Sequence, residues 1–229
     1  LFDETDGIDF EAVAETQPDV ILAAYSGLTQ EDYDTLSKIA PVVAYPDAAW
    51  GTSMDDMIRM NSEAMGMADE GEALIDEITT ESQAAFDAHP ELADVSPLFA
   101  FTDATDLSTV TYYTDHDPRA SYLSEFGMPV PAQVATATDE TDAFYTDISS
   151  ENADRFSDVG VWITYGPTDG SLVAQLQADP LLSQVPAIAQ GRIAILPDST
   201  PLAAAANPTP LSIAWGLNDY LDILTAAVR

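Results

Sequence analysis

The chain has 229 residues, of which 46% are hydrophobic, so it can bury the core of one large domain or of two smaller lobes. Its 40 acidic residues outnumber its 6 basic residues and give a net charge of -34. A charge of this sign and size repels nucleic acid and anionic lipid, and we exclude both as partners. No apolar run reaches the roughly 18 residues that a membrane-spanning helix needs.

The same composition indicates where the protein works. A hydrated acidic surface is typical of a protein that stays soluble in salt or at a cell exterior, and cation binding by the surface as a whole is the alternative. The absence of cysteine excludes disulfides, thiolate metal sites and cysteine nucleophiles. The sequence starts at Leu1 without a signal peptide, so we expect a mature or trimmed form.

The N-terminal part predicts a strand–helix–strand unit. Residues 11–17 resemble the end of a helix, and an apolar strand is expected at 20–24. Thr29 opens a capping-box pattern for a short helix, and Pro41 ends that helix. A second strand is expected at 41–45. Two strands separated by one short helix indicate a parallel sheet.

Two helices are predicted after this unit. Following a loop at 46–53, Ser53 caps an amphipathic helix, and Gly66 interrupts it. The second helix runs from about Asp69 to Ala88, which is roughly 30 Å at 1.5 Å per residue. We expect this long helix to act as a strut between two lobes.

The C-terminal part predicts a second alternating set of elements. Strands are expected at 97–102, 109–113, 159–165 and 192–196, and helices at 118–126, 170–178 and 209–226. The predicted fold class is therefore α/β with parallel sheets. The predicted domains are an N-terminal lobe at 1–53, a linking helical segment at 54–95 and a C-terminal lobe at 96–229.

Aromatic side chains stand at the carboxyl ends of several predicted strands. Ligands of open parallel sheets bind outside these ends, and tyrosine and tryptophan suit a partly hydrated cleft that holds a bulky ligand. The candidate binding residues are Tyr25, Ser26, Tyr45, Trp50, Tyr112, Tyr113 and Tyr165. Gly27 is expected to let the backbone approach the ligand. Taken singly, each tyrosine also fits an ordinary half-exposed position at a sheet rim.

Arg119 is a further candidate because it is one of only 6 basic residues and lies at the start of a predicted helix. A cation there is unfavourable for the helix dipole, which suggests that another interaction holds it. It either clamps carboxylate or carbonyl oxygens of a ligand, or forms a salt bridge with Asp115 or Asp117. Both interpretations stay open.

The histidines and the missing catalytic motifs argue against metal-binding proteins and against several classes of enzyme. His89 precedes a proline at a helix end and is interpreted as a solvated cap residue, and His116 between two aspartates is a weak metal signal. The nucleophile elbow, the nucleotide P-loop and the zinc-protease motif are absent. We therefore expect no catalytic residues, no metal site and no cofactor.

Several stretches, taken together, carry a family likeness over most of the chain. They are QPDVILAAYSGLTQEDYDTLSKIAPVVAY at 17–45, AWGTS before the long helix, DPRASYLSEFGM at 117–128 and DPLLSQVPAIAQGRIAILPDSTPLA at 179–203. In combination they resemble ABC-transporter substrate-binding proteins for iron–siderophore complexes, of the ferrichrome and iron-dicitrate type. The resemblance implies the class III architecture, two Rossmann-like lobes joined by one long helix, with little hinge motion. Such proteins carry about another half-lobe before the position of Leu1, so the N-terminal lobe is expected to be incomplete.

The resemblance also implies a function. A periplasmic protein or cell-surface lipoprotein of this type, expected as a monomer, captures an iron–siderophore complex in a shallow cleft between the lobes. It then docks on an ABC transporter permease through acidic residues. The implied ligand contacts fall on the seven strand-end candidates and on Arg119, whereas Leu182 replaces an aromatic residue of some relatives. The acidic charge favours a neutral or cationic hydroxamate complex over a trianionic catecholate complex.

Other functions remain as alternatives. A cobalamin or haem receptor has the same fold, and a zinc or manganese receptor is disfavoured because two histidines do not supply an imidazole-rich site. A hydrolase that uses paired carboxylates, and a structural surface protein without a ligand, are the alternatives from other classes.

Overall fold

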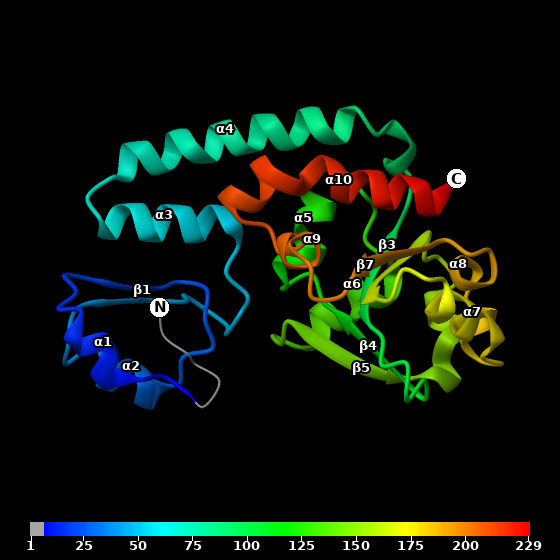
Figure 1. The fold of residues 1–229 in the computed structure, drawn as a ribbon, viewed down its shortest axis with the longest axis horizontal. Coiled ribbons are helices and arrows are strands. Elements are labelled where there is room, and N and C mark those ends of the chain that lie inside the picture. The colour runs from blue at the N-terminus through cyan, green and yellow to red at the C-terminus, as the bar shows by residue number, and fades with distance from the viewer. Residues whose placement is uncertain (1–6) are drawn as a thin grey trace. The chain divides into compact units, whose positions relative to one another are not determined.

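The computed structural model describes residues 7–229 and divides into two compact units, Leu1–Ile75 and Asp76–Arg229 (Figure 1). The division falls inside a long helix, α4 (Ala68–Asp87). The N-terminal unit therefore includes a helix that the sequence assigned to the linking segment. Within residues 7–229, no helix combines the length and the apolarity that crossing a bilayer requires.

The N-terminal unit contains the predicted strand–helix–strand motif. Helix α1 (Phe10–Glu15) precedes β1 (Ile21–Ala23), and α2 (Gln30–Leu36) connects it to β2 (Val42–Ala44). The two strands pair in parallel, as predicted. Thr29 is the N-cap of α2, and its side chain and that of Asp32 each accept the other residue's backbone N–H, so the predicted capping box is confirmed.

The two predicted helices follow. Ser53 caps α3 (Met54–Ala64) by accepting the N–H of Asp56, and α4 extends over 20 residues, the length that the sequence predicted. A side chain at Gly71 would overlap the Ser62 hydroxyl, so the glycine lets the first turn of α4 pack against α3. The role of α4 as a strut between lobes stays a prediction.

The C-terminal unit is built on a five-stranded sheet with the order β5-β4-β3-β6-β7. Its strands are β3 (Pro97–Phe101), β4 (Thr109–Tyr113), β5 (Tyr145–Ser149), β6 (Val161–Gly166) and β7 (Ile193–Pro197). Strands β3, β6 and β7 are parallel, but β4 runs antiparallel to both β3 and β5. The prediction of a parallel sheet is therefore correct for three strands and wrong for β4, and β5 was not predicted.

Helices cover both faces of this sheet. One face carries α6 (Ala132–Glu140), α7 (Ser171–Ala178) and α8 (Pro186–Ala189), together with the short 3-10 helices η2 (Ser150–Phe156) and η3 (Leu182–Gln184). Helix α5 (Pro118–Glu125) packs against β3 on the other face, where α10 (Pro210–Val228) packs against β6 and β7. The remaining helices of this unit are η1 (Pro90–Leu92) and α9 (Pro201–Ala205).

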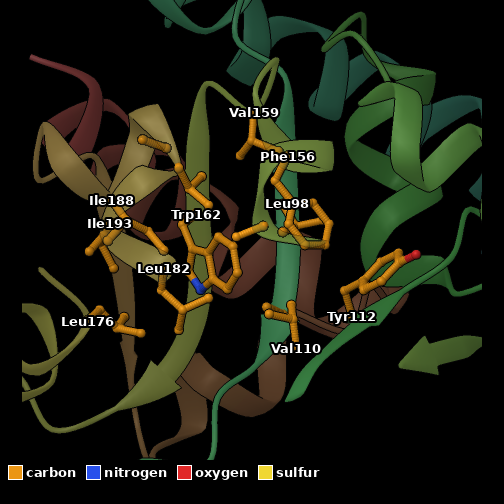
Figure 2. Close-up of a cluster of buried hydrophobic side chains, with 14 of the residues drawn as sticks. Leu98, Val110, Tyr112, Phe156, Val159, Trp162, Leu176, Leu182, Ile188 and Ile193 are labelled. Atoms are coloured by element: carbon orange, nitrogen blue, oxygen red, sulfur yellow. The ribbon is translucent and has the colours of Figure 1, made fainter. Parts of the chain in front are cut away.

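Trp162, Tyr112 and Phe156, three of the largest fully buried side chains, lie on the first of these faces (Figure 2). Trp162 of β6 is 1% exposed, and its ring centroid lies 5.9 Å from that of Phe156. Phe156 in turn makes an edge contact with Tyr112 of β4 at 5.4 Å. Leu182, which the sequence compared with an aromatic position of some relatives, is 2% exposed and belongs to this cluster. It is therefore a core residue.

His89 connects the end of α4 to α10 within the C-terminal unit, and it is not the solvated cap that the sequence suggested. Its side chain is only 12% exposed. Nδ1 lies 2.8 Å from the carbonyl oxygen of Ala85, and Nε2 lies 3.2 Å from Oδ1 of Asp222. A carbonyl only accepts, so Nδ1 carries a proton, and Nε2 donates to Asp222 only when the ring is an imidazolium.

This geometry predicts that His89 stabilises the protein at low pH more than at high pH. The Ala85 carbonyl, and then Asp222 and Glu91, raise the pKa of His89 against the opposing effect of burial. Because the pKa of His89 is higher in the folded state, its protonation stabilises the fold. This stabilisation is complete below the pKa of the unfolded state, about 6.5, and is lost as the pH rises through the pKa of the folded state. We expect about 1 kcal/mol of this stabilisation to disappear in urea titrations between pH 5.5 and 8.5. His89→Gln should abolish that difference, and an unchanged pH dependence in the variant would contradict the assignment.

Candidate functional site

The N-terminal unit brings Tyr25, Ser26 and Trp50 together at the carboxyl end of β1. The ring centroids of Tyr25 and Trp50 are 5.3 Å apart in an edge-to-face arrangement, and the backbone N–H of Trp50 donates to the backbone carbonyl of Ser26 at 3.0 Å. Trp50 has a positive φ of 62° and is 40% exposed. Residues other than glycine seldom take this backbone conformation, so holding an exposed indole there is consistent with a binding role.

Gly27 serves this cluster in a way that the sequence did not predict. A Cβ at position 27 would lie 2.6 Å from Nε1 of Trp50, so the glycine makes room for the indole. The space on the Cβ side of Gly27 is therefore taken by a tryptophan of the same unit, and approach of a ligand to the Gly27 backbone stays a prediction.

Tyr45 follows β2, and its hydroxyl donates to the carbonyl of Leu28 at 2.9 Å. The side chain is half-buried, and the hydrogen bond fixes the ring over the loop that leads into α2. Ser26 is tied to its own strand because its hydroxyl donates to the carbonyl of Ala23 at 2.8 Å. These two side chains shape the strand ends, and direct ligand contact by either of them stays a prediction.

In the C-terminal unit, Tyr113 and Tyr165 gather around Phe99 on one face of the sheet. Each of the two tyrosine rings lies 5.4 Å from the ring of Phe99, measured between centroids. Phe99 is buried, whereas both tyrosines are half-buried. Burial raises the pKa of Tyr165, although the nearby Arg119 opposes this effect. The Tyr165 hydroxyl therefore stays protonated at neutral pH and can donate a hydrogen bond.

Arg119 lies against this aromatic group and is paired with an internal acid. Its Nε and NH2 groups both donate to the carboxylate of Asp117 at 2.8 Å, and its guanidinium carbon lies 4.1 Å from the centre of the Tyr113 ring. Burial alone would lower the pKa of Arg119, but the hydrogen bonds and charge of Asp117 raise it. The salt-bridge interpretation thus describes the structure, and the contact with Tyr113 adds a cation–π interaction. Whether Arg119 also contacts a ligand stays a prediction.

Tyr112 does not lie with the other candidates. It is 1% exposed, its ring belongs to the core cluster on the opposite face of the sheet, and its hydroxyl accepts from Gln133 at 2.8 Å (Figure 2). Successive residues of a strand point to opposite faces, so Tyr112 and Tyr113 cannot both serve one surface. We withdraw Tyr112 from the candidate site.

The structure adds aromatic residues that the sequence reasoning missed. Tyr145 of β5 pairs directly with Tyr113 of β4 and is 44% exposed, and Phe144 stacks on Tyr113 at 6.5 Å. Phe101 at the end of β3 is 55% exposed on the same face. The signal for Tyr145 was the alternation of YTDIS, which predicts a half-exposed strand.

An open surface pocket of 630 Å³ in the same unit also escaped prediction. It lies between α9 and the start of α10, and its lining includes Trp215 and Leu211, which are 59% and 85% exposed. The sequence predicted a helix at 209–226 in this region but no pocket beside it. None of the predicted site residues lines the pocket.

The weak metal signal around His116 has no structural support. His116 Nε2 lies 3.1 Å from the carbonyl oxygen of Thr138, and Asp117 is bound to Arg119. Among residues 7–229, no group of three or more histidine and acidic side chains is arranged to hold a metal ion.

Comparison with known proteins agrees with this architecture. The sequence profile of the family described as "Periplasmic binding protein" matches residues 2–200. No match was found among curated protein sequences.

Among solved structures, the iron uptake ABC transporter substrate-binding protein PiaA from Streptococcus pneumoniae TIGR4 is 44% identical to this chain, with a TM-score of 0.92. The match covers 100% of this chain and 78% of that protein. A second structure of PiaA, in complex with ferrichrome, is 45% identical with a TM-score of 0.94, covering 100% and 76% of the two chains. A periplasmic solute binding protein from Mycobacterium smegmatis, 23% identical over 99% of this chain and 75% of that one, shares the fold with a TM-score of 0.75. This chain belongs to the periplasmic binding protein family.

Proposed function

We propose that this protein captures a ferric siderophore of the hydroxamate type outside the cytoplasm and delivers it to an ABC importer. The observation that carries the proposal is the 45% identity, over the whole chain, to PiaA in a structure that contains ferrichrome. Ferrichrome is a hydroxamate complex of iron. The protein acts by binding and release, so no side chain has to perform chemistry.

The aromatic surfaces of the two units support this function. In such a complex the chelator fills the coordination sphere of the iron, so the protein needs contacts for an organic shell and no metal ligands of its own. Exposed or half-buried rings provide such contacts, and Trp50 in one unit and Tyr113 in the other are the central ones. A net charge of -34 disfavours a trianionic catecholate complex. That the two surfaces contact one ligand stays a prediction.

The cellular setting follows from the proposed function. The protein works outside the cytoplasm, either in a periplasm or as a lipoprotein on the cell surface, and it acts as a monomer that docks on the membrane permease of the importer. We assign no individual acidic residue to docking, because 40 of them are distributed along the chain.

Calorimetric titration tests the proposal. We expect saturable binding of ferrichrome and much weaker binding of a ferric triscatecholate. Trp50→Ala and Tyr113→Ala should each weaken ferrichrome binding roughly tenfold or more, because a large ring at the centre of a contact supplies much of the affinity. Tyr33→Ala is the matched control, since Tyr33 is 37% exposed on α2 away from the strand ends. The absence of ferrichrome binding by the unmodified protein would refute the function.

A further inference from the structure

The aromatic face of the C-terminal sheet continues into a row of polar residues. In the register of β4 and β5, Tyr113 pairs with Tyr145, and the next pair on the same face is Thr111 with Asp147. Phe101 of β3 extends this second row because it pairs with Thr111. The acidic side chain of Asp147 therefore lies two residues along β5 from the exposed Tyr145, on the same face of the sheet as the ligand-binding candidates.

Asp147 is held in place on this face. Its side chain is exposed, and Oδ1 accepts a hydrogen bond from the Thr111 hydroxyl at 2.6 Å. The pair lies directly opposite across the two strands, where side chains are about 5 Å apart. A hydrogen bond from a fixed β-branched residue orients the carboxylate, so its negative charge has a defined position beside Tyr145 and Phe101.

We propose that Asp147 determines charge selectivity, making the aromatic face prefer ferric hydroxamate complexes that carry a positive charge over neutral ones. The inference rests on the proposed function and goes further, because it names the charge class of the ligand and the residue that reads it. An ammonium group on the siderophore lies within reach of the Asp147 carboxylate when the organic shell packs on the Tyr145 and Tyr113 rings.

The net charge of the protein provides only a diffuse part of this selection. Charges of the remaining surface are screened over about 8 Å at physiological ionic strength and attract every cation alike. An acidic group in contact with the ligand is screened less and acts at one place on the ligand. Asp147 therefore distinguishes ferric complexes of the same hydroxamate coordination by whether they carry an ammonium group.

Ferrichrome, which is neutral, and ferrioxamine B, which carries one protonated amine, are suitable probes. Dissociation constants are measured by calorimetry for the unmodified protein, Asp147→Asn and Asp147→Lys. We expect Asp147→Asn to weaken ferrioxamine B binding about fivefold and to change ferrichrome binding less than twofold. Asp147→Lys should weaken ferrioxamine B binding by about 25-fold, because it reverses the charge.

Asp139→Asn is the matched control. It removes the same charge from an exposed position of α6, which covers the opposite face of the sheet. Equal changes for both ligands in Asp147→Asn, or the same selectivity change in Asp139→Asn, would overturn the inference while leaving the proposed function intact. If the unmodified protein binds neither complex, the proposed function fails and the inference fails with it.

Discussion

Replacing Asp117 by asparagine is expected to lower the free energy of unfolding of the C-terminal unit by about 3 kcal/mol. The Asp117 carboxylate is 0% exposed and makes two hydrogen bonds to the guanidinium of Arg119, whose side chain is only 17% exposed. Asparagine keeps the shape and still offers an oxygen to the backbone N–H of Arg119, which Asp117 caps at 2.8 Å. The expected loss is therefore the cost of a largely buried cation without a counter-ion.

A double-mutant cycle separates this effect from capping. Arg119→Met should be destabilising because it leaves a buried carboxylate, and the double variant Asp117→Asn with Arg119→Met should lose less than the sum of the two single changes. Urea titrations in a Trp50→Phe background report on the C-terminal unit alone, since the remaining tryptophans, Trp162 and Trp215, both belong to it. Additive effects of the two single variants would show that the pair contributes nothing as a pair.

Short sequence motifs correctly predicted where helices start, because a helix start is stabilised by residues close to it in the chain. The capping box at Thr29, the cap at Ser53 and the proline after Asp117 each lie at the start of a helix, as expected, because capping depends on a few neighbouring residues. The antiparallel direction of β4 was not predictable in this way. Strand direction depends on pairing with β3 and β5, and the exposed, alternating β5 gives only a weak signal of its own.

The sequence predicted the candidate site only in part, because position along a strand is readable from the sequence but the surroundings of a side chain depend on the folded structure. The strand-end rule proposed Tyr165 and Trp50 from position alone, and the structure leaves Tyr165 half-buried and Trp50 40% exposed. The choice of Tyr112 was wrong because the strand-end rule does not say which face of the sheet a side chain occupies. Side chains alternate between the two faces along a strand, so Tyr112 points into the core when Tyr113 points to the other face. The packing of Gly27 was not predicted because its neighbour, Trp50, comes 23 residues later in the chain and only the folded structure places them together.

Replacing Trp162 by alanine should have the other large effect, a loss of about 3–5 kcal/mol of stability. Trp162 is 1% exposed at the centre of the core cluster, on a strand with neighbours on both sides, so alanine leaves a cavity that the sheet cannot close (Figure 2). Chemical denaturation followed by circular dichroism measures this loss.

Trp162→Phe is the matched second variant, because comparing it with Trp162→Ala separates the effect of side-chain volume from the effect of the buried N–H group. The indole N–H of Trp162 is buried without a hydrogen-bond partner among the described residues, and a buried unpaired donor costs about 1–3 kcal/mol. Phenylalanine removes that donor while it keeps most of the ring, so we expect its stability to stay within about 1 kcal/mol of the unmodified protein. A loss for Trp162→Phe as large as that for Trp162→Ala would contradict this account. Because Tyr165 lies on the opposite face of the same strand, a retained Trp162→Phe fold should also retain ferrichrome binding.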